Sequence, residues 1–211
     1  MNTPLLVRRL GPTDFENTCQ AMQRFTAERT EETPDELWLT EHPAVYSLGL
    51  NRKNVRLPSR NDIPVVNTDR GGKITYHGVG QVIVYVLLDL TRHHLNIRQL
   101  VTVLEGTVVN LLADFGIQAY SKSDAPGVYV KNAHNQEAKI ASLGLRIKNN
   151  RCYHGLSLNV DMDLTPFSAI DPCGYVGLAV TQTKDLGITA DVKMLGGKLL
   201  EKLSAQFAHG N

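Results

Sequence analysis

The stretch that decides the fold is KIASLGLRIKNNRCYHGLSLNV, residues 139–160. Hydrophobic residues alternate with small or polar ones on both sides of Asn149-Asn150, which is the period of β-strands. Asparagine tolerates the positive φ angles that a two-residue hairpin turn requires. We therefore predict two antiparallel strands joined at this dipeptide, and counting outward from the turn fixes which residues face one another.

This count predicts one packed face and one nearly bare face. The hydrophobic layer contains three facing pairs: Leu143–Leu156, Ala141–Leu158 and Ile147–Cys152. The opposite face contains Ile140–Asn159 and two pairs with almost no side chain: Ser142–Ser157 and Gly144–Gly155. Glycine inside a strand often marks close approach of a ligand or of another backbone. The patch therefore serves either a tightly packed element or a slender substrate.

Lys139 falls on the hydrophobic side if the strand alternates without a bulge. A lysine in that position either extends its ammonium group to the rim or loses part of its hydration. Loss of hydration suits a lysine to proton transfer. Both readings stay open at this point.

The rest of the chain adds helices and further strands. Apolar residues recur at helical spacing in three segments: one that starts at the Thr13–Glu16 capping box, one over 97–115 that Gly116 ends, and one that opens near Asp191. Further strands are expected at 36–39, 44–48, 81–88 and 127–130. Several strands follow one another without an intervening helix, which favours an α+β fold with a mixed, largely antiparallel sheet flanked by helices. The absence of a linker predicts a single domain over 1–211.

Composition narrows the function classes. The 211 residues contain 22 Lys+Arg and 21 Asp+Glu, so a broad nucleic-acid-binding surface is not expected. The longest apolar run, Val82–Leu88, is far shorter than the roughly 20 residues of a membrane span. The first ten residues hold too short an apolar stretch for a signal peptide. We expect a cytoplasmic protein with reduced thiols and no membrane segment.

The segment RGGKITYHGVGQ, residues 70–81, is the densest in polar, aromatic and glycine residues. It matches neither the Walker loop nor the dinucleotide-binding fingerprint. Glycines let a backbone approach a ligand, and free N–H groups can bind an oxyanion. We favour a binding loop over a long decorated turn.

Among the three cysteines, only Cys173 lies in a turn, within DPCG. Cys19 falls on the apolar stripe of a helix and Cys152 in the hairpin's hydrophobic layer, so both are expected in the core. Cys173 is therefore the candidate nucleophile, with inert packing as the alternative. No tight metal-ligand spacing occurs, so neither a metal nor another cofactor is expected. The adjacent His93 and His94 are expected to be solvated.

Positive charge gathers in NRKNVRLPSR, which places Arg52, Lys53, Arg56 and Arg60 within ten residues. Such a run is either a solvated loop or a docking site for an acidic partner.

Several motifs in order resemble the lipoyl(octanoyl) transferase family, the octanoyl-[acyl-carrier-protein]:protein N-octanoyltransferases. They are EHPAVYSLG, DRGGKITYHGVGQ, PGVYV, KIASLGLRI, HGLSLNV, DLTPF and DPCG, from Glu41 to Gly174. The family usually has HGPGQ where this chain has Val79, and the stretch before Lys139 is longer than usual. The resemblance implies the α+β fold of biotin- and lipoate-protein ligase catalytic domains.

The resemblance also implies roles for particular residues. Cys173 becomes the acyl-thioester nucleophile, and Lys139 the thiolate stabiliser and general base. The family's substrate contacts fall on three groups: Arg70, Gly71, Gly72, Lys73, Ile74, Thr75, Tyr76 and His77; Ser142, Leu143 and Gly144; Gly155, Leu156 and Ser157. The last two groups contain the bare patch.

The implied reaction moves an octanoyl or lipoyl group from acyl carrier protein to a lysine, as the first step of endogenous protein lipoylation. The implied acceptors are lipoyl domains of 2-oxoacid dehydrogenase complexes and the glycine cleavage H protein. Two alternatives remain. An ATP-dependent lipoate-protein ligase would share the fold but not need Cys173, and a catalytically silent relative would only bind lipoyl domains or carrier protein.

Overall fold

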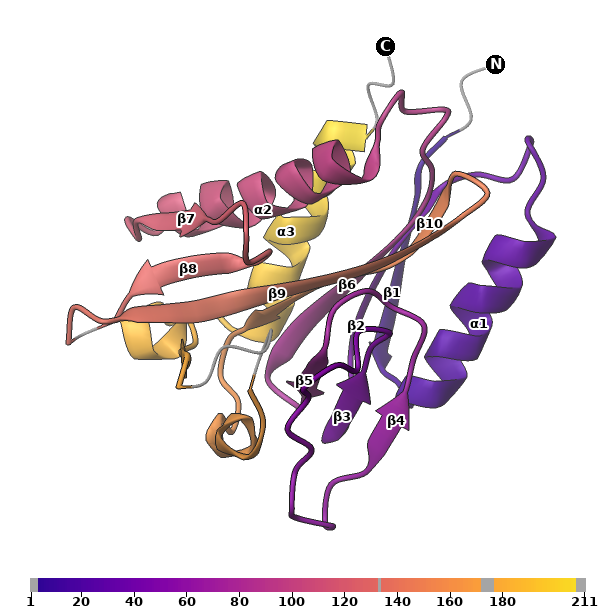
Figure 1. Ribbon diagram of the computed structural model, residues 1–211. Coiled ribbons are helices and arrows are strands. Elements are labelled where there is room, and N and C mark those ends of the chain that lie inside the picture. Colours follow the sequence, from indigo (N-terminus) through magenta and orange to yellow (C-terminus); the bar gives the residue numbers. More distant parts are fainter. Residues whose placement is uncertain (1–3, 133, 172–176, 208–211) are drawn as a thin grey trace.

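The computed structural model describes residues 4–132, 134–171 and 177–207. Within them, eight strands form a mixed sheet in the order β1-β2-β6-β10-β9-β8-β7, with β11 paired to β9 (Figure 1). The strands of this sheet are β1 (Leu6–Pro12), β2 (Glu36–Glu41), β6 (Gln81–Asp89), β7 (Ala119–Ser121), β8 (Val128–Lys131), β9 (Glu137–Lys148), β10 (Arg151–Asn159) and β11 (Ala179–Val180). Among the described strands of this larger sheet, only the β1–β2 and β9–β11 pairs are parallel. The predicted α+β class is confirmed.

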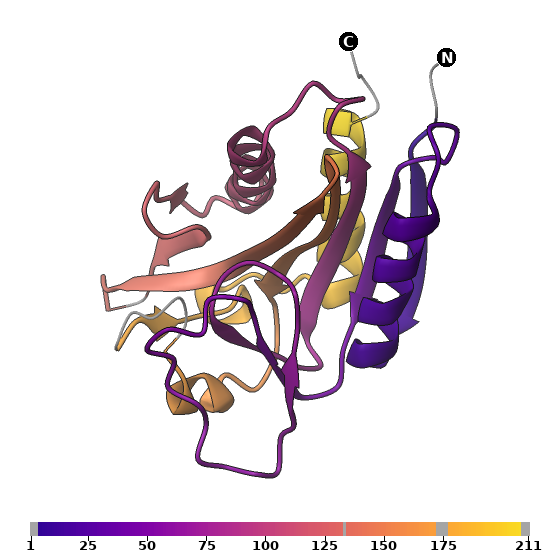
Figure 2. The same ribbon diagram turned by 45° about the vertical axis from the view of Figure 1, so that its right-hand side comes forward.

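Helices cover both faces of the sheet. Helices α2 (Ile97–Ala113) and α3 (Val192–Phe207) lie on one face, and α1 (Phe15–Glu28) lies on the other (Figure 2). The larger core forms under α2 and α3 from the even-numbered residues of β6, such as Val84 and Val86. The smaller core forms under α1, with Ile83, Tyr85 and Leu87 of the same strand. Strand β6 is thus buried on both faces, as its continuous apolar sequence requires.

The hairpin forms with the predicted register. Asn149 and Asn150 both have positive φ angles, 52° and 57°. Gly144 pairs with Gly155 and Ser142 with Ser157, so the bare patch is confirmed. The expected Ile140–Asn159 pair is wrong, because the β9–β10 pairing ends at Ala141–Leu158 and Asn159 pairs with β6 instead.

A second, smaller sheet lies beside the first. It has the order β4-β3-β5, with β3 at Val45–Leu48, β4 at Val65–Asn67 and β5 at Ile74–His77. Segment 70–81 was expected to be a binding loop, but its middle residues, Ile74–His77, form strand β5, antiparallel to β3. The 3-10 helices η1 (Thr165–Ala169) and η3 (Lys184–Leu186) complete the described elements. The small sheet packs against η1 through Tyr76 and Phe167, whose ring centroids are 5.4 Å apart.

Helix α1 begins one residue later than its sequence predicts. Asp14, not Thr13, is the N-cap, and its carboxylate accepts from the Asn17 N–H at 2.9 Å. The Thr13 hydroxyl instead contacts Thr40 at 2.7 Å. The Asp14 cap satisfies an orphan amide of the first turn, one residue further along than the Glu16 amide that a Thr13 cap would have satisfied.

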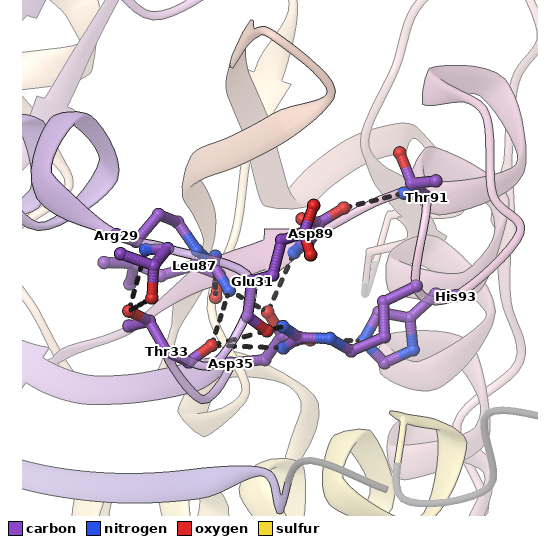
Figure 3. A network of polar contacts seen from close by, with 10 residues as sticks. Arg29, Glu31, Thr33, Asp35, Leu87, Asp89, Thr91 and His93 are labelled. Carbon is purple, nitrogen blue, oxygen red and sulfur yellow. Dashed lines mark hydrogen bonds and ion pairs between the residues drawn. The ribbon is translucent and has the colours of Figure 1, made fainter. Parts of the chain in front are cut away.

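A buried ionic network ties β2, β6 and the loop before α2 together (Figure 3). The Asp35 carboxylate is paired with Arg29 at 2.5 Å, His93 at 2.7 Å and Arg92 at 3.1 Å, and it accepts from the Asp89 N–H at 2.8 Å. The prediction that His93 is solvated is therefore wrong, although His94 is exposed. A local sequence pattern cannot place the distant acidic partner that draws His93 inward.

None of the described helices combines the length and the apolar character that a membrane crossing requires.

Candidate active site

A pocket lies between the bare face of the β9–β10 hairpin and the segment around β5. Gly72, Lys73, Ile74 and Thr75 form one side of it, and the hairpin forms the floor. All the substrate-contact residues expected from the family resemblance line this pocket except Gly71 and Tyr76. Gly71 lines a neighbouring groove, and Tyr76 points into the cluster around η1. The bare patch of the hairpin and the residues expected from the family motifs therefore line the same pocket.

Arg70 holds the roof of the pocket in position. Its guanidinium donates to the carbonyls of Ser47 at 2.5 Å, Lys73 at 2.8 Å and Gly71 at 2.9 Å. The side chain is only 8% exposed, and its stem crosses Gly144. A Cβ on Gly144 would lie 3.0 Å from the Arg70 Cδ, so this glycine leaves room for the arginine. Arg70 therefore shapes the loop through bonds to backbone carbonyls.

Gly155 is needed for a different reason. A Cβ at this position would collide with the Val84 carbonyl group of the adjacent strand. The preceding residue, His154, has a φ of 63°, at the point where the pairing with β6 passes from Cys152–Leu88 to Gly155–Tyr85. The bare patch was predicted to accommodate either a tightly packed element or a slender substrate. At Gly155 the reason is the close approach of another backbone, whereas Ser142 and Ser157 line the pocket.

Four side chains that the sequence did not single out as site residues also line the pocket. They are Phe15 of α1, Ile83 and Tyr85 of β6, and His154 of β10. All four are buried. The rings of Phe15 and His77 stack with centroids 5.4 Å apart. No local sequence pattern reveals these four residues, because they reach the patch only through the β6–β10 pairing and the packing of α1.

Buried histidines lie around the end of the pocket that Phe15, Ile83 and Tyr85 form, and each of these histidines is hydrogen-bonded. His77 contacts Gln81 at 2.8 Å through Nδ1 and Ser47 at 3.0 Å through Nε2. Burial, together with nearby His42, lowers the pKa of His77 to about 3. The pKa of His42 is also lowered by burial. Its Nδ1 donates to the Thr13 carbonyl at 2.8 Å, so its Nε2 accepts from the Tyr85 hydroxyl at 2.7 Å. The His42 and His77 rings are thus uncharged at neutral pH.

Asp69 is the acidic partner of this region. It accepts from His154 Nε2 at 2.9 Å and from the Tyr153 hydroxyl. Burial raises the pKa of Asp69, but the hydrogen bonds from His154 and Tyr153 outweigh burial and hold that pKa well below its usual range. The carboxylate therefore stays ionised and fixes the His154 ring at the pocket wall.

A register shift reverses the predicted orientation of Lys139. Val128 pairs with Ala141, but Tyr129 pairs with Lys139, so Ile140 is an extra residue in β9. An extra residue inverts the alternation of faces. Val128 and Val130 both face the core under α2, so Tyr129 and Lys139 face the opposite side. The condition of an alternation without a bulge is therefore not met, and the bulge turns Lys139 to the face that carries Ser142.

The Lys139 ammonium group is held by a short loop between β7 and β8. The side chain is only 2% exposed, and Nζ donates to the Pro126 carbonyl at 2.8 Å. A Cβ on Gly127 would collide with the Lys139 Cε, so only glycine at this position leaves room for the lysine side chain. The Gly127 N–H donates to the buried carboxylate of Glu105, of α2, at 2.7 Å. The Pro126-Gly127 turn is thus fixed by an acid on one side and contacts the lysine on the other.

Cys173 lies outside the described residues, but the chain on both sides of it is held in place. Before it, Asp171 pairs with Arg56 at 3.1 Å, and Arg56 also donates to the carbonyls of Ser168 at 2.9 Å and Ile170 at 2.7 Å. After it, Ala179 pairs with Ala138 and Val180 with Lys139. The chain that follows Cys173 therefore returns to the strand that carries Lys139.

The other two thiols are in the core, as predicted. Cys19 and Cys152 are buried, and burial raises the pKa of each to about 12. Neither supplies a thiolate at neutral pH. Among the residues that the structure describes, no cluster of three or more His, Cys, Asp or Glu side chains could hold a metal ion.

Comparison with known proteins decides the family. The profile of the lipoyl protein ligase A/B catalytic domain matches residues 16–204. The chain is 54% identical to the octanoyltransferase of Nitrosomonas eutropha over 203 residues, which cover 96% of this chain and 88% of the relative. It is 53% identical to the octanoyltransferase of Dechloromonas aromatica over 208 residues, which cover 99% of both chains. The chain belongs to the octanoyltransferase family. As a family member it is a transferase enzyme.

Solved structures show the fold of this octanoyltransferase family member in more distant proteins. A bipartite lipoate protein ligase from Thermoplasma acidophilum superposes with a TM-score of 0.73 at 17% identity, covering 98% of this chain and 84% of that one. Biotin protein ligase from Aquifex aeolicus, in complex with biotin and ATP, gives 0.59 at 15% identity, with coverages of 96% and 69%. The predicted likeness to the catalytic domains of both ligase classes is confirmed.

Proposed function

We propose that this chain moves an octanoyl group from acyl carrier protein to a lysine of a lipoyl domain, through a thioester on Cys173. The named relatives are octanoyltransferases, which supports the acyl group. The observation that carries the assignment is the bulge at Ile140, which turns Lys139 out of the core and toward the substrate-side face. A lysine in the packed layer could not take part in the reaction.

The first half-reaction exchanges one thioester for another. The Cys173 thiolate attacks the octanoyl carbonyl, the bond to the donor sulfur breaks, and the carrier leaves as a thiolate. The Lys139 ammonium stabilises the attacking thiolate and then donates its proton to the departing carrier thiolate, which leaves Lys139 as the neutral amine. Arg56 and β11 anchor the chain on either side of Cys173, which supports a short distance between the Cys173 thiolate and the Lys139 ammonium.

The second half-reaction forms the amide. The ε-amine of the acceptor lysine attacks the octanoyl-Cys173 carbonyl, and the cysteine leaves as a thiolate. Lys139, as the neutral amine, accepts the proton that the incoming nitrogen loses. The backbone N–H of Gly72 serves as a candidate oxyanion donor, because the Gly71 N–H already donates to the Leu145 carbonyl at 2.8 Å. The acyl donor is already activated, so neither ATP nor a metal ion takes part.

The basic run 51–60 supports docking of the acidic carrier, but not with all of its charges. Arg56 is engaged with Asp171, and Arg60 is paired with Asp62 at 2.7 Å. Arg52 and Lys53 are exposed on the same loop. Reversing these two charges should weaken carrier binding and reduce its salt dependence. Unchanged carrier affinity in the Arg52→Glu/Lys53→Glu variant would remove this part of the proposal.

Intact mass spectrometry tests the reaction. The protein is incubated with octanoyl-acyl carrier protein without ATP, beside a Cys173→Ala variant, and then with a lipoyl domain. A hydroxylamine-labile octanoyl adduct on the wild type only, discharged by the lipoyl domain, is the expected result. A Lys139→Ala variant should slow formation and discharge, whereas Lys148→Ala, at the hairpin tip, should not.

Two other outcomes would replace the proposal. Transfer that needs free octanoate and ATP, with no adduct, would indicate a lipoate-protein ligase. Binding of a lipoyl domain without transfer under either condition would indicate a silent relative. A cytoplasmic location is part of the proposal, because a catalytic thiol needs a reducing compartment.

A further inference from the structure

The open part of the pocket floor is a single row of residues across three strands. Ser142 of β9 pairs with Ser157 of β10, and Ser157 pairs with Ile83 of β6. Residues that pair directly across a sheet point to the same face. The row therefore begins with two small side chains and ends at a large one. The parallel row through Gly144 is less open, because the stem of Arg70 crosses it.

The length of this row matches an eight-carbon acyl chain. Neighbouring strands lie about 4.8 Å apart, so the two steps from Ser142 to Ile83 span about 10 Å. An octanoyl group has seven C–C bonds that each advance about 1.3 Å along an extended chain, about 9 Å in all. A decanoyl group would need about 11 Å on the same basis.

The far end of the row is closed by packed side chains. Ile83 is 2% exposed and belongs to the cluster under α1, with Phe15 and Tyr85. All three line the pocket. Tyr85 is fixed by the hydrogen bond of its hydroxyl to His42 at 2.7 Å. Beyond Ile83 the row continues to Thr40 of β2, which is also buried. A rigid end wall of this kind cannot yield to a longer chain without repacking the α1 core.

The near end of the row lies on the strand of the reacting groups. Lys139 and Ser142 are both on β9 and face the same side, and β11 brings the chain that follows Cys173 to this strand. An acyl chain whose carbonyl carbon lies at β9 therefore directs its methyl end toward β6.

We infer that Ile83, supported by Phe15 and Tyr85, stops the methyl end of the acyl chain and thereby sets the chain length that the enzyme accepts. This inference rests on the proposed acyl transfer. Ile83 is a specificity-determining residue that contacts substrate without taking part in the chemistry.

Two substitutions should shift the preference in opposite directions. Ile83→Ala lengthens the row and should raise the decanoyl-to-octanoyl ratio of kcat/KM about tenfold or more, the usual effect of a methylene in an apolar pocket. Ser157→Val fills the middle of the row and should raise the hexanoyl-to-octanoyl ratio by a similar factor. Donors are hexanoyl, octanoyl, decanoyl and dodecanoyl thioesters of one acyl carrier protein, with initial rates and adduct masses as readouts.

Leu87→Ala is the matched control. Leu87 lies on the same face of the same strand, in the same cluster, but does not line the pocket. It should lower stability as Ile83→Ala does and leave the chain-length ratios at wild-type values. Circular dichroism and the urea midpoint identify any variant that fails to fold, in which case Ser157→Val carries the test.

The outcomes separate the two ideas. A wild type that forms no acyl adduct with any donor would overturn the proposed function and this inference with it. The inference alone would be overturned if the wild type forms the adduct but the chain-length ratios of kcat/KM do not shift. That result requires the ratios of folded Ile83→Ala and Ser157→Val variants to lie within twofold of those of Leu87→Ala. Opposite shifts in the two variants would support it.

Discussion

Lys139 lies opposite Tyr129 in the β8–β9 pairing, and its Nζ atom is 5.3 Å from the centroid of the Tyr129 ring. An ammonium group at this distance is attracted to the ring face. The Tyr129 hydroxyl in turn donates to the Ala125 carbonyl at 2.9 Å, one residue before the carbonyl that Lys139 contacts. One loop and one ring therefore fix a buried lysine on the side of the sheet where the proposed reaction occurs.

The path of this lysine depends on Gly127. A Gly127→Ala substitution should reduce acyl transfer at least tenfold, because the added methyl group would displace the Lys139 side chain. Gly116→Ala is the control, since Gly116 also has a positive φ but no neighbour within 4 Å of its Cβ position. Steady-state rates of both variants check the prediction. Equal losses in the two would show that backbone strain, not the position of Lys139, is responsible.

Arg56 anchors the chain that leads to Cys173. Arg56→Ala removes the contacts to Ser168, Ile170 and Asp171, and should slow octanoyl-adduct formation severalfold while leaving carrier affinity nearly unchanged. Compared with Arg56→Ala, Arg56→Lys keeps the positive charge but lacks the several N–H donors of the guanidinium group, so it should recover only part of the rate. Single-turnover adduct formation and carrier binding are measured separately. A loss confined to carrier affinity would make Arg56 a docking residue instead.

Acid should destabilise the protein through His77. The folded state keeps this ring neutral down to about pH 3 because it is buried, whereas the unfolded chain takes up a proton near the ordinary pKa of about 6.5. The free energy of unfolding should therefore fall as the pH drops from about 6.5 toward 3, by up to about 1.4 kcal/mol per pH unit for this group. The lowered pKa values of His42 and His154 act in the same direction.

Urea unfolding between pH 7 and pH 4.5 measures this slope. His77→Gln, which keeps a hydrogen-bonding side chain, should flatten it, and His94→Gln, at an exposed position, should not. A wild-type slope in His77→Gln would assign the acid sensitivity to other groups.

The network around Asp35 should dominate local stability. Asp35→Asn leaves Arg29 and its neighbours buried without their carboxylate, which should cost about 3–5 kcal/mol of unfolding free energy. Burial raises the pKa of Asp35, but hydrogen bonds from His93 and Arg29 outweigh burial and lower that pKa. The stabilisation is therefore present at neutral pH and is lost as the pH falls through the folded-state pKa.

The exposed Arg60–Asp62 pair supplies the comparison, and Asp62→Asn should leave the urea midpoint at its wild-type value. A similarly small effect in Asp35→Asn would mean that the network adds specificity without stability.

The sequence by itself determined the features that local rules control. The Asn149-Asn150 turn fixes the hairpin register, because counting from a two-residue turn needs no knowledge of the rest of the chain. Helical spacing located α2 and α3. Apolar context placed Cys19 and Cys152 in the core. The same counting located the bare patch, and the ordered motifs located the loop that covers it.

Only the tertiary structure decided the orientation of Lys139 and the inner wall of the pocket. The bulge at Ile140 exists only relative to β8, so no pattern within residues 139–160 reveals it. Likewise, Ile83 and Tyr85 join the patch only because β6 pairs with β10, and Phe15 only because α1 packs over them. Turn geometry and side-chain periodicity are properties of neighbouring residues. Which strand lies beside which, and in what register, is set by burial across the whole domain, and that pairing determines which way Lys139 faces.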